Sequence, residues 1–185
     1  MSRRGATSRR QVTRVTQVTQ AKGAAAAGGS KQVLTFTLGD ETYGVDILRV
    51  QEIRGWAPVT RIPQAQAHVL GVLNLRGSIV PIVDLRMRFE LPRAEYTPLT
   101  VIIVLSVESP QGRRDFGLVV DGVSDVVDVA LGDVKQAPDL GQQANTEFIA
   151  GLAAVSGRML MLLDIDRLIG GEVAGATSVP VAANG

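Results

Sequence analysis

The chain has 185 residues, of which 45% are hydrophobic and 20% charged, a composition typical of a globular protein with a substantial core. It has no cysteine and one histidine, His68, which excludes disulfides, thiol nucleophiles and cysteine-based metal sites. A metal site would have to consist almost wholly of carboxylates, so we expect no metal and no cofactor. No apolar run approaches the roughly 18 residues of a membrane-spanning helix, so we expect no membrane insertion.

The net charge of +1 conceals an asymmetry. Residues 1–30 are rich in Ala, Gly, Ser, Thr and Gln and contain no aromatic residue and no acid. Their basic residues are Arg3, Arg4, Arg9, Arg10, Arg14 and Lys22. Such a segment buries little apolar surface, which predicts a disordered tail, although its composition also resembles a transit peptide. The rest of the chain is mildly acidic, which disfavours nucleic-acid binding by the folded body.

From Lys31 onward, short runs rich in Val, Ile, Leu, Thr and Phe recur between Gly, Pro and Asp. Their length is typical of β-strands. The predicted strands are 33–38, 42–46, 51–54, 71–75, 78–84, 99–107, 115–120, 123–128, 148–155 and 158–164. We expect short helical pieces at 65–70, 85–89 and 165–169. The pattern predicts an all-β protein of small sheets or barrels, followed by a flexible tail at 172–185.

An internal repeat links residues 71–85 to residues 151–165. The residues that recur without a gap are Gly71 and Gly151, Gly77 and Gly157, and Asp84 and Asp164. Each copy reads as a strand, a tight turn in which glycine supplies a positive φ, and a second, buried strand. The aspartate that ends this strand is expected to cap the next helical turn.

A fainter similarity relates residues 43–46 to residues 116–121, since both begin with an aromatic residue and glycine and end in aspartate. The simplest account is one domain over 31–171 that holds two similar β-subdomains. We place these subdomains at about 33–88 and 98–164. A closing helix at 165–169 would follow them.

Arg76 stands out because it does not recur in the second copy, where Ser156 takes its place. The hairpin therefore needs its glycine but not its arginine. Arg76 is either a solvated turn residue or a recognition residue whose planar guanidinium binds a carboxylate or a backbone oxygen of a partner.

No catalytic motif is present, and we assign no catalytic residue. The candidate acids lie mostly at strand ends, where turn and cap roles suffice. They are Asp46, Asp84, Asp121, Asp125 and Asp164. His68 precedes an apolar strand and is expected to be partly packed. Trp56 is either a lid on the core or an exposed anchor for a partner.

Four blocks of the sequence resemble the CheW family of chemotaxis coupling proteins. They are 36–55 (FTLGDETYGVDILRVQEIRG), 71–86 (GVLNLRGSIVPIVDLR), 117–126 (GLVVDGVSDV) and 148–152 (FIAGL). The blocks occur in the family's order, and the resemblance covers about residues 32–170. The Arg-rich tail has no counterpart in the family pattern.

The resemblance implies two five-stranded SH3-like barrels packed as one domain, and a non-enzymatic adaptor. It implies cytoplasmic binding to the CheW-like regulatory domain of the histidine kinase CheA and to methyl-accepting receptors in membrane-associated arrays. The positions that match the family's receptor-contacting groove, between the barrels, are Val50, Glu52, Arg76, Val101 and Ile102. Two alternatives remain: a small hydrolase that uses strand-end carboxylates, and a nucleic-acid or membrane-surface binder that acts through residues 1–30.

Overall fold

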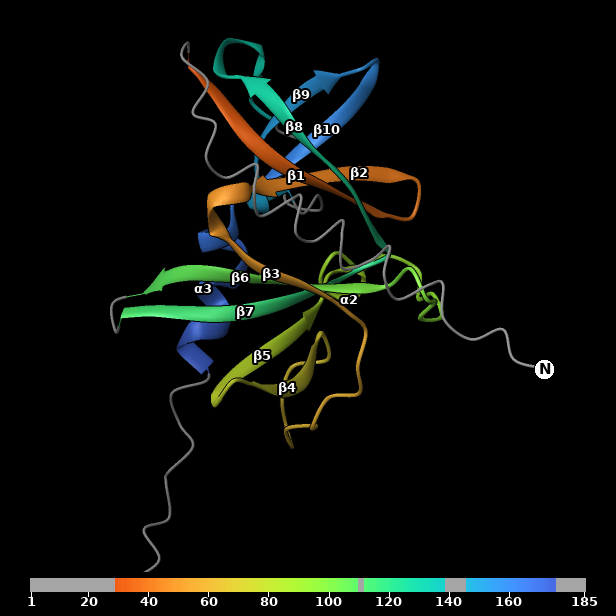
Figure 1. Cartoon of the computed structure of the whole chain (residues 1–185), viewed down its shortest axis with the longest axis vertical. Coiled ribbons are helices and arrows are strands. Elements are labelled where there is room, and N and C mark those ends of the chain that lie inside the picture. Colours follow the sequence, from red (N-terminus) through yellow and green to blue (C-terminus); the bar gives the residue numbers. More distant parts are fainter. Residues whose placement is uncertain (1–28, 110–111, 139–145, 176–185) are drawn as a thin grey trace, which may run out of the picture.

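Figure 1 shows the computed structural model, which describes residues 29–109, 112–138 and 146–175. Ten strands dominate these residues and form two five-stranded sheets. Sheet A, in the order β8-β1-β2-β10-β9, consists of β1 (Ser30–Leu38), β2 (Glu41–Asp46), β8 (Gly122–Ala130), β9 (Ile149–Val155) and β10 (Arg158–Leu163). Sheet B, in the order β3-β6-β7-β5-β4, consists of β3 (Val50–Gly55), β4 (Val69–Leu75), β5 (Ser78–Asp84), β6 (Val101–Ser109) and β7 (Gly112–Val120).

All ten predicted strands are present, with small shifts at their ends. The all-β prediction of two five-stranded units is confirmed, and the sheets are consistent with SH3-like barrels. Neighbouring strands pair antiparallel, except for the parallel pairs β2–β10 and β5–β7. In these two pairs Gly44 lies opposite Leu162, and Gly117 lies opposite Ile82. The repeat seen in the sequence is thus also a repeat of strand pairing.

The two sheets exchange strands between the halves of the chain. The first half, residues 30–88, contributes β1 and β2 to sheet A but β3, β4 and β5 to sheet B. The second half, residues 101–175, contributes β6 and β7 to sheet B but β8, β9 and β10 to sheet A. In Figure 1 the chain passes from one sheet to the other at β3 and again at β8.

This exchange corrects the predicted subdomain boundaries, because neither 33–88 nor 98–164 corresponds to one sheet. Both halves carry the same pattern of apolar strands. A strand can therefore form its backbone hydrogen bonds with a strand of either half of the chain. The apolar pattern alone does not decide which of the two it pairs with.

The largest cluster of buried side chains lies between the two sheets and draws on both of them. Its members include Phe36 of β1 and Phe116 of β7. A smaller cluster around Ile102 belongs to sheet B, and another around Val33 belongs to sheet A. Because one central core spans both sheets, the two units are packed as a single domain.

The helices begin at the capping positions expected from the repeat. Asp84 accepts hydrogen bonds from the first backbone N–H groups of α2 (Leu85–Arg88), and Asp164 accepts one from Arg167 N at the start of α3 (Ile165–Gly175). Short 3-10 helices lie at η2 (Ile47–Arg49), η3 (Leu131–Asp133) and η4 (Thr146–Phe148). Among the described residues, no helix is long and apolar enough to cross a membrane.

Three predicted features differ from the structure. Residues 65–70 are not helical: they contain a turn at 67–68 and the first two residues of β4, since Pro63 and the positive φ of Gln64 (60°) prevent a helix from continuing into them. Regular structure also extends into both predicted tails, since β1 starts at Ser30 and α3 runs to Gly175. Residues 1–28 and 176–185 lie outside the described residues.

Candidate functional site

The tips of two equivalent hairpins frame the site. Arg76 and Gly77 have φ of 54° and 87° between β4 and β5, and Ser156 and Gly157 have 50° and 76° between β9 and β10. Two successive positive φ angles are typical of the type I′ turn that joins twisted strands. Asn74 Oδ1 additionally accepts a hydrogen bond from Gly77 N at 2.9 Å. Both turns thus hold glycine in the left-handed region that the sequence predicted.

Arg76 is brought together with Glu52, another predicted site residue. Arg76 Nη2 lies 2.9 Å from Glu52 Oε2, and Glu52 Oε1 lies 3.7 Å from Arg54 Nη1. Glu52 belongs to β3 and Arg76 to the β4–β5 hairpin, and β3 and β4 are the two edges of sheet B. The pair therefore connects opposite edges of the sheet. The Arg76 side chain is 87% exposed, so most of its guanidinium remains open to solvent.

The other three predicted site residues are buried rather than exposed. Val50 and Val101 pack in the central cluster, and Ile102, with no exposed surface, packs in the cluster of sheet B. Ile102 lies opposite Arg54 in the β3–β6 register, and Val104 lies opposite Glu52. Of the five predicted site residues, Glu52 and Arg76 thus reach the surface, while Val50, Val101 and Ile102 lie buried beneath it.

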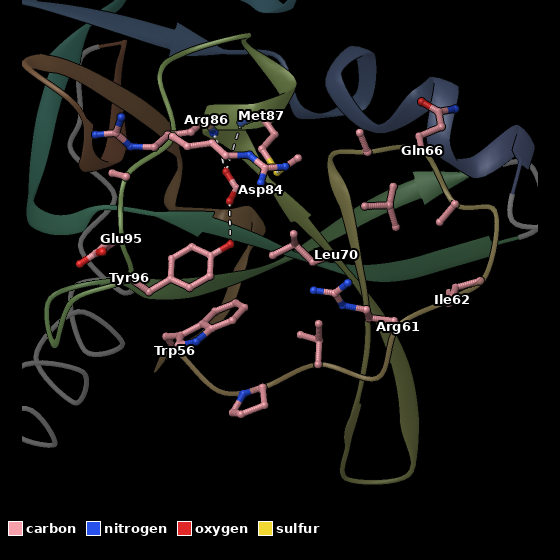
Figure 2. Close-up of a pocket in the computed structure, with 17 residues that line it drawn as sticks. Trp56, Arg61, Ile62, Gln66, Leu70, Asp84, Arg86, Met87, Glu95 and Tyr96 are labelled. Atoms are coloured by element: carbon pink, nitrogen blue, oxygen red, sulfur yellow. Dashed lines mark hydrogen bonds between the residues drawn. The ribbon is translucent and has the colours of Figure 1, made fainter.

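A cavity of about 950 Å³ opens on another side of sheet B, between the segment that follows β3 and the segment that precedes β6 (Figure 2). Tyr96 forms one wall, with its ring centroid 4.2 Å from that of Trp56. Its hydroxyl donates a hydrogen bond to Asp84 Oδ2 at 2.9 Å, while Asp84 Oδ1 caps α2. Burial, and then the bond to Asp84, raise the pKa of Tyr96 to about 12. Trp56 is thus partly packed, between the two roles considered for it.

Arg86, also at this cavity, reaches to the crossing between the sheets. Its Nε and Nη2 atoms donate to Asp121 Oδ1 and Oδ2 at 2.6 and 2.5 Å, and its Nη1 donates to the Pro92 carbonyl at 2.8 Å. Gly39 N also donates to Asp121. Partial burial opposes ionisation of Asp121, but the bonds from Arg86 and Gly39 outweigh it, so its pKa lies below the usual value.

The strand-end acids hold backbone and ion-pair positions rather than converging on one point. Asp46 caps η2 and pairs with Lys31 at 3.0 Å, and Asp125 accepts a hydrogen bond from Val126 N. Asp84, Asp121 and Asp164 have the partners given above. No group of three or more His, Asp or Glu side chains within the described ranges is placed to hold a metal ion. His68 is half-buried, and its carbonyl accepts a hydrogen bond from Asp84 N.

A family model described as "CheW-like domain" matches residues 32–173, which is most of the chain. The chain belongs to the CheW family. The match includes both sheets, the Glu52–Arg76 pair and the cavity beside Tyr96. Proteins of the CheW family are scaffold or adaptor proteins of chemotaxis and not enzymes, so the hydrolase alternative does not hold for this CheW-like domain.

Named CheW relatives agree with this assignment. The chain is 47% identical over 142 residues to the chemotaxis protein CheW of Klebsiella aerogenes, covering 77% of this chain and 83% of that protein. It is 42% identical over 144 residues to the CheW of Rhizobium meliloti, covering 78% and 90%. The solved structure of the scaffolding protein TtCheW from Thermoanaerobacter tengcongensis superposes with a TM-score of 0.70 at 27% identity, covering 79% of this chain and 92% of that one.

Sequence reasoning missed two contacts of this CheW-like domain. It did not connect Tyr96 with Asp84, or Arg86 with Asp121. The partners are 12 and 35 positions apart, and no periodic pattern relates them. The available signals were weak: Tyr96 is a lone aromatic residue between Pro92 and Pro98, and Arg86 stands two residues after the helix-capping Asp84.

Proposed function

We propose that this CheW adaptor couples the histidine kinase CheA to methyl-accepting chemoreceptors in cytoplasmic signalling arrays, and that Glu52 and Arg76 form the polar part of its receptor-binding surface. The CheW-like match over residues 32–173 supports the adaptor role. The observation that carries the assignment of the surface is the exposed guanidinium of Arg76, which is anchored to Glu52 on one side only.

The anchoring by Glu52 suits Arg76 for recognition. A single hydrogen bond from Nη2 limits the rotamers of the long side chain, and so lowers the entropy lost when a partner binds. Among the described residues Glu52 is its one recorded hydrogen-bond partner, so other N–H groups remain to bind a carboxylate or a carbonyl of the receptor. Val50, Val101 and Ile102 would act from beneath, by holding β3 in place.

The test compares Arg76→Ala with the wild type for binding to purified receptor fragments and for receptor-dependent kinase activation. Loss of a charge paired at an interface costs about 2 kcal/mol or more of binding, so we expect affinity to fall roughly thirtyfold or more. The free energy of unfolding should change by about 0.5 kcal/mol or less. Arginine and alanine adopt the positive φ of this turn equally well, and an exposed ion pair contributes little to stability. Arg76→Lys should restore binding only in part, because an ammonium lacks the planar fork.

Ser156→Ala is the matched control, because Ser156 occupies the same position with the same positive φ in the other hairpin. It should leave receptor binding, kinase binding and melting temperature unchanged. Unaltered coupling by Arg76→Ala would remove Arg76 from the receptor surface. Absence of binding by the wild type to both CheA and receptor fragments would instead refute the adaptor proposal itself.

A further inference from the structure

Two ion pairs lie where the chain crosses between the sheets. At the first crossing, η2, Arg49 Nη2 lies 2.6 Å from Asp166 Oδ2 in the first turn of α3. At the second crossing, Asp121 alone separates β7 from β8, and it is bound by both Nε and Nη2 of Arg86 in α2. Each pair therefore joins the crossing of one half of the chain to the helix of the other half.

The two ion pairs lie at corresponding crossings and helices, with the signs of the charges reversed between the halves. Arg86 and Asp166 both stand two residues after the aspartates that cap α2 and α3. The first half carries an arginine both in its helix and at its crossing, Arg86 and Arg49. The second half carries an aspartate at both places, Asp166 and Asp121. Two unlike halves attract at both contacts, whereas two like halves would not.

We propose that these four charges select the partner of each half, so that it closes on the other half of the same chain and resists closing on the corresponding half of a second copy. Two first halves paired with each other would place Arg86 against Arg49 twice. Two second halves would place Asp166 against Asp121 twice. Like charges at close range destabilise a wrong pairing by more than opposite charges stabilise the right one.

This selection matters because the strands themselves discriminate weakly. The sheets have matching orders, and each parallel contact places a glycine, Gly44 or Gly117, against an aliphatic residue of the partner. A half could therefore form the same ladder on a copy of itself. The side chains of the two ion pairs are between 17% and 47% exposed, so solvent and salt screen them only in part. The nearby Asp46 is paired with Lys31 of the same half, at 3.0 Å.

The experiment reverses one pair in the full-length chain by combining Arg49→Asp with Asp166→Arg. The native attraction is kept with its sign inverted, but each half now carries opposite charges at helix and crossing and becomes complementary to its own copy. After refolding at high concentration and low salt, we expect the dimer association constant to rise roughly tenfold over the wild type, measured by light scattering on a sizing column. High salt should reduce this rise.

Two chains could also form a dimer by domain swapping, in which the first half of one chain pairs with the second half of the other. This dimer keeps every native charge contact, so it forms equally in the wild type and the variant and cancels in the comparison. The neutral variant Arg49→Gln with Asp166→Asn should form fewer dimers than the reversed pair. A reversed-pair protein that stays as monomeric as the wild type at low salt would overturn the proposal.

The single substitutions provide a second measurement that does not depend on dimer formation. Arg49→Asp alone and Asp166→Arg alone each place like charges together within the monomer and should lower its melting temperature. The combined reversal should recover most of that loss. If it recovers nothing, the residues do not attract each other and cannot select partners, which would also overturn the proposal.

Discussion

Arg76 and Ser156 occupy the same turn position with nearly the same φ, 54° and 50°, yet only Arg76 has an acidic partner. The sequence distinguished the two, because a repeat separates what every copy needs from what one copy adds. The family resemblance, not the repeat, implied that Glu52 belongs to the same surface. The resemblance placed Val101 and Ile102 in the groove, although the unbroken apolar run around them is the pattern of a strand buried on both faces.

The turn glycines give a first prediction at this scale. Gly77→Val and Gly157→Val should each lower stability by about 1–3 kcal/mol, since a β-branched residue resists a positive φ. An added Cβ would meet no atom within 4 Å at either position, so backbone strain is the only cause. Chemical denaturation measures both losses. Ser156→Ala and Arg76→Ala keep the glycines and serve as controls, and unchanged stability of both valine variants would contradict the turn geometry.

Tyr96 gives a second prediction. Its pKa of about 12, raised from 10.0 first by burial and then by the bond to Asp84, means that its contribution to stability is complete below about pH 10 and is lost as the pH rises toward 12. Phenolate absorbance of the folded protein should therefore appear at higher pH than that of the urea-unfolded chain. Trp56, the only tryptophan, reports the same change through fluorescence.

Tyr96→Phe is the control for this titration. It should remove the phenolate signal of the high-pH step and leave that of Tyr43, whose pKa is raised by burial and by Glu41. Coincident titration curves for the folded and unfolded wild type would show that Tyr96 is not held by Asp84 as described.

Individual strands were predictable because each is a short apolar run ended by a turn signal. The 65–70 segment was not, since Ala, Gln and Leu favour a helix locally while the preceding backbone prevents one. The edge of β4 is instead covered by the segment that precedes residues 65–70, in which Thr60 exchanges two backbone hydrogen bonds with Val72. Lys135 does the same for Leu152 of β9. Both edge strands are thus capped by one added bridge, which leaves them less open to pairing with another chain.

These bridges lead to a prediction about the glycine beside each of them. An alanine Cβ at Gly71, where φ is +148°, would lie 2.1 Å from Thr60 O, so Gly71→Ala must displace the bridge and should cost about 2 kcal/mol or more. At Gly151 the nearest atoms are Val134 Cγ1 at 2.5 Å and Lys135 O at 3.0 Å. A side chain yields more easily than a backbone, so Gly151→Ala should cost less. Urea denaturation compares the two, and equal losses would contradict this account.

At the level of the whole molecule, the sequence predicted the duplication but not the exchange of strands. The pairing is decided by contacts between distant residues, such as the Arg86–Asp121 and Arg49–Asp166 pairs and the central cluster, and none of these leaves a local pattern. Family resemblance supplied the number of strands and sheets. It did not say which half each strand comes from.

The Arg86–Asp121 contact predicts how acid affects this arrangement. The pKa of Asp121 is lowered in the folded state, so its stabilising effect is present above the ordinary carboxyl pKa and is lost as the pH falls below about 4. Asp121→Asn should lower the melting temperature at neutral pH, and the gap from the wild type should narrow in acid. Arg86→Lys keeps the charge but not the two-point contact, so it should lose less. A gap that is constant with pH would show that ionised Asp121 does not stabilise the fold.

The exchange of strands also decides what a broken chain would do. Arg93 lies in the exposed segment between α2 and β6, and a protease cut after it would separate the two halves covalently. Each sheet would still hold strands from both pieces, with the central core between them intact. The nicked protein should therefore migrate as one particle until it is denatured, and neither fragment has the strands to rebuild a complete sheet alone. The molecule can be cut in two and still not come apart.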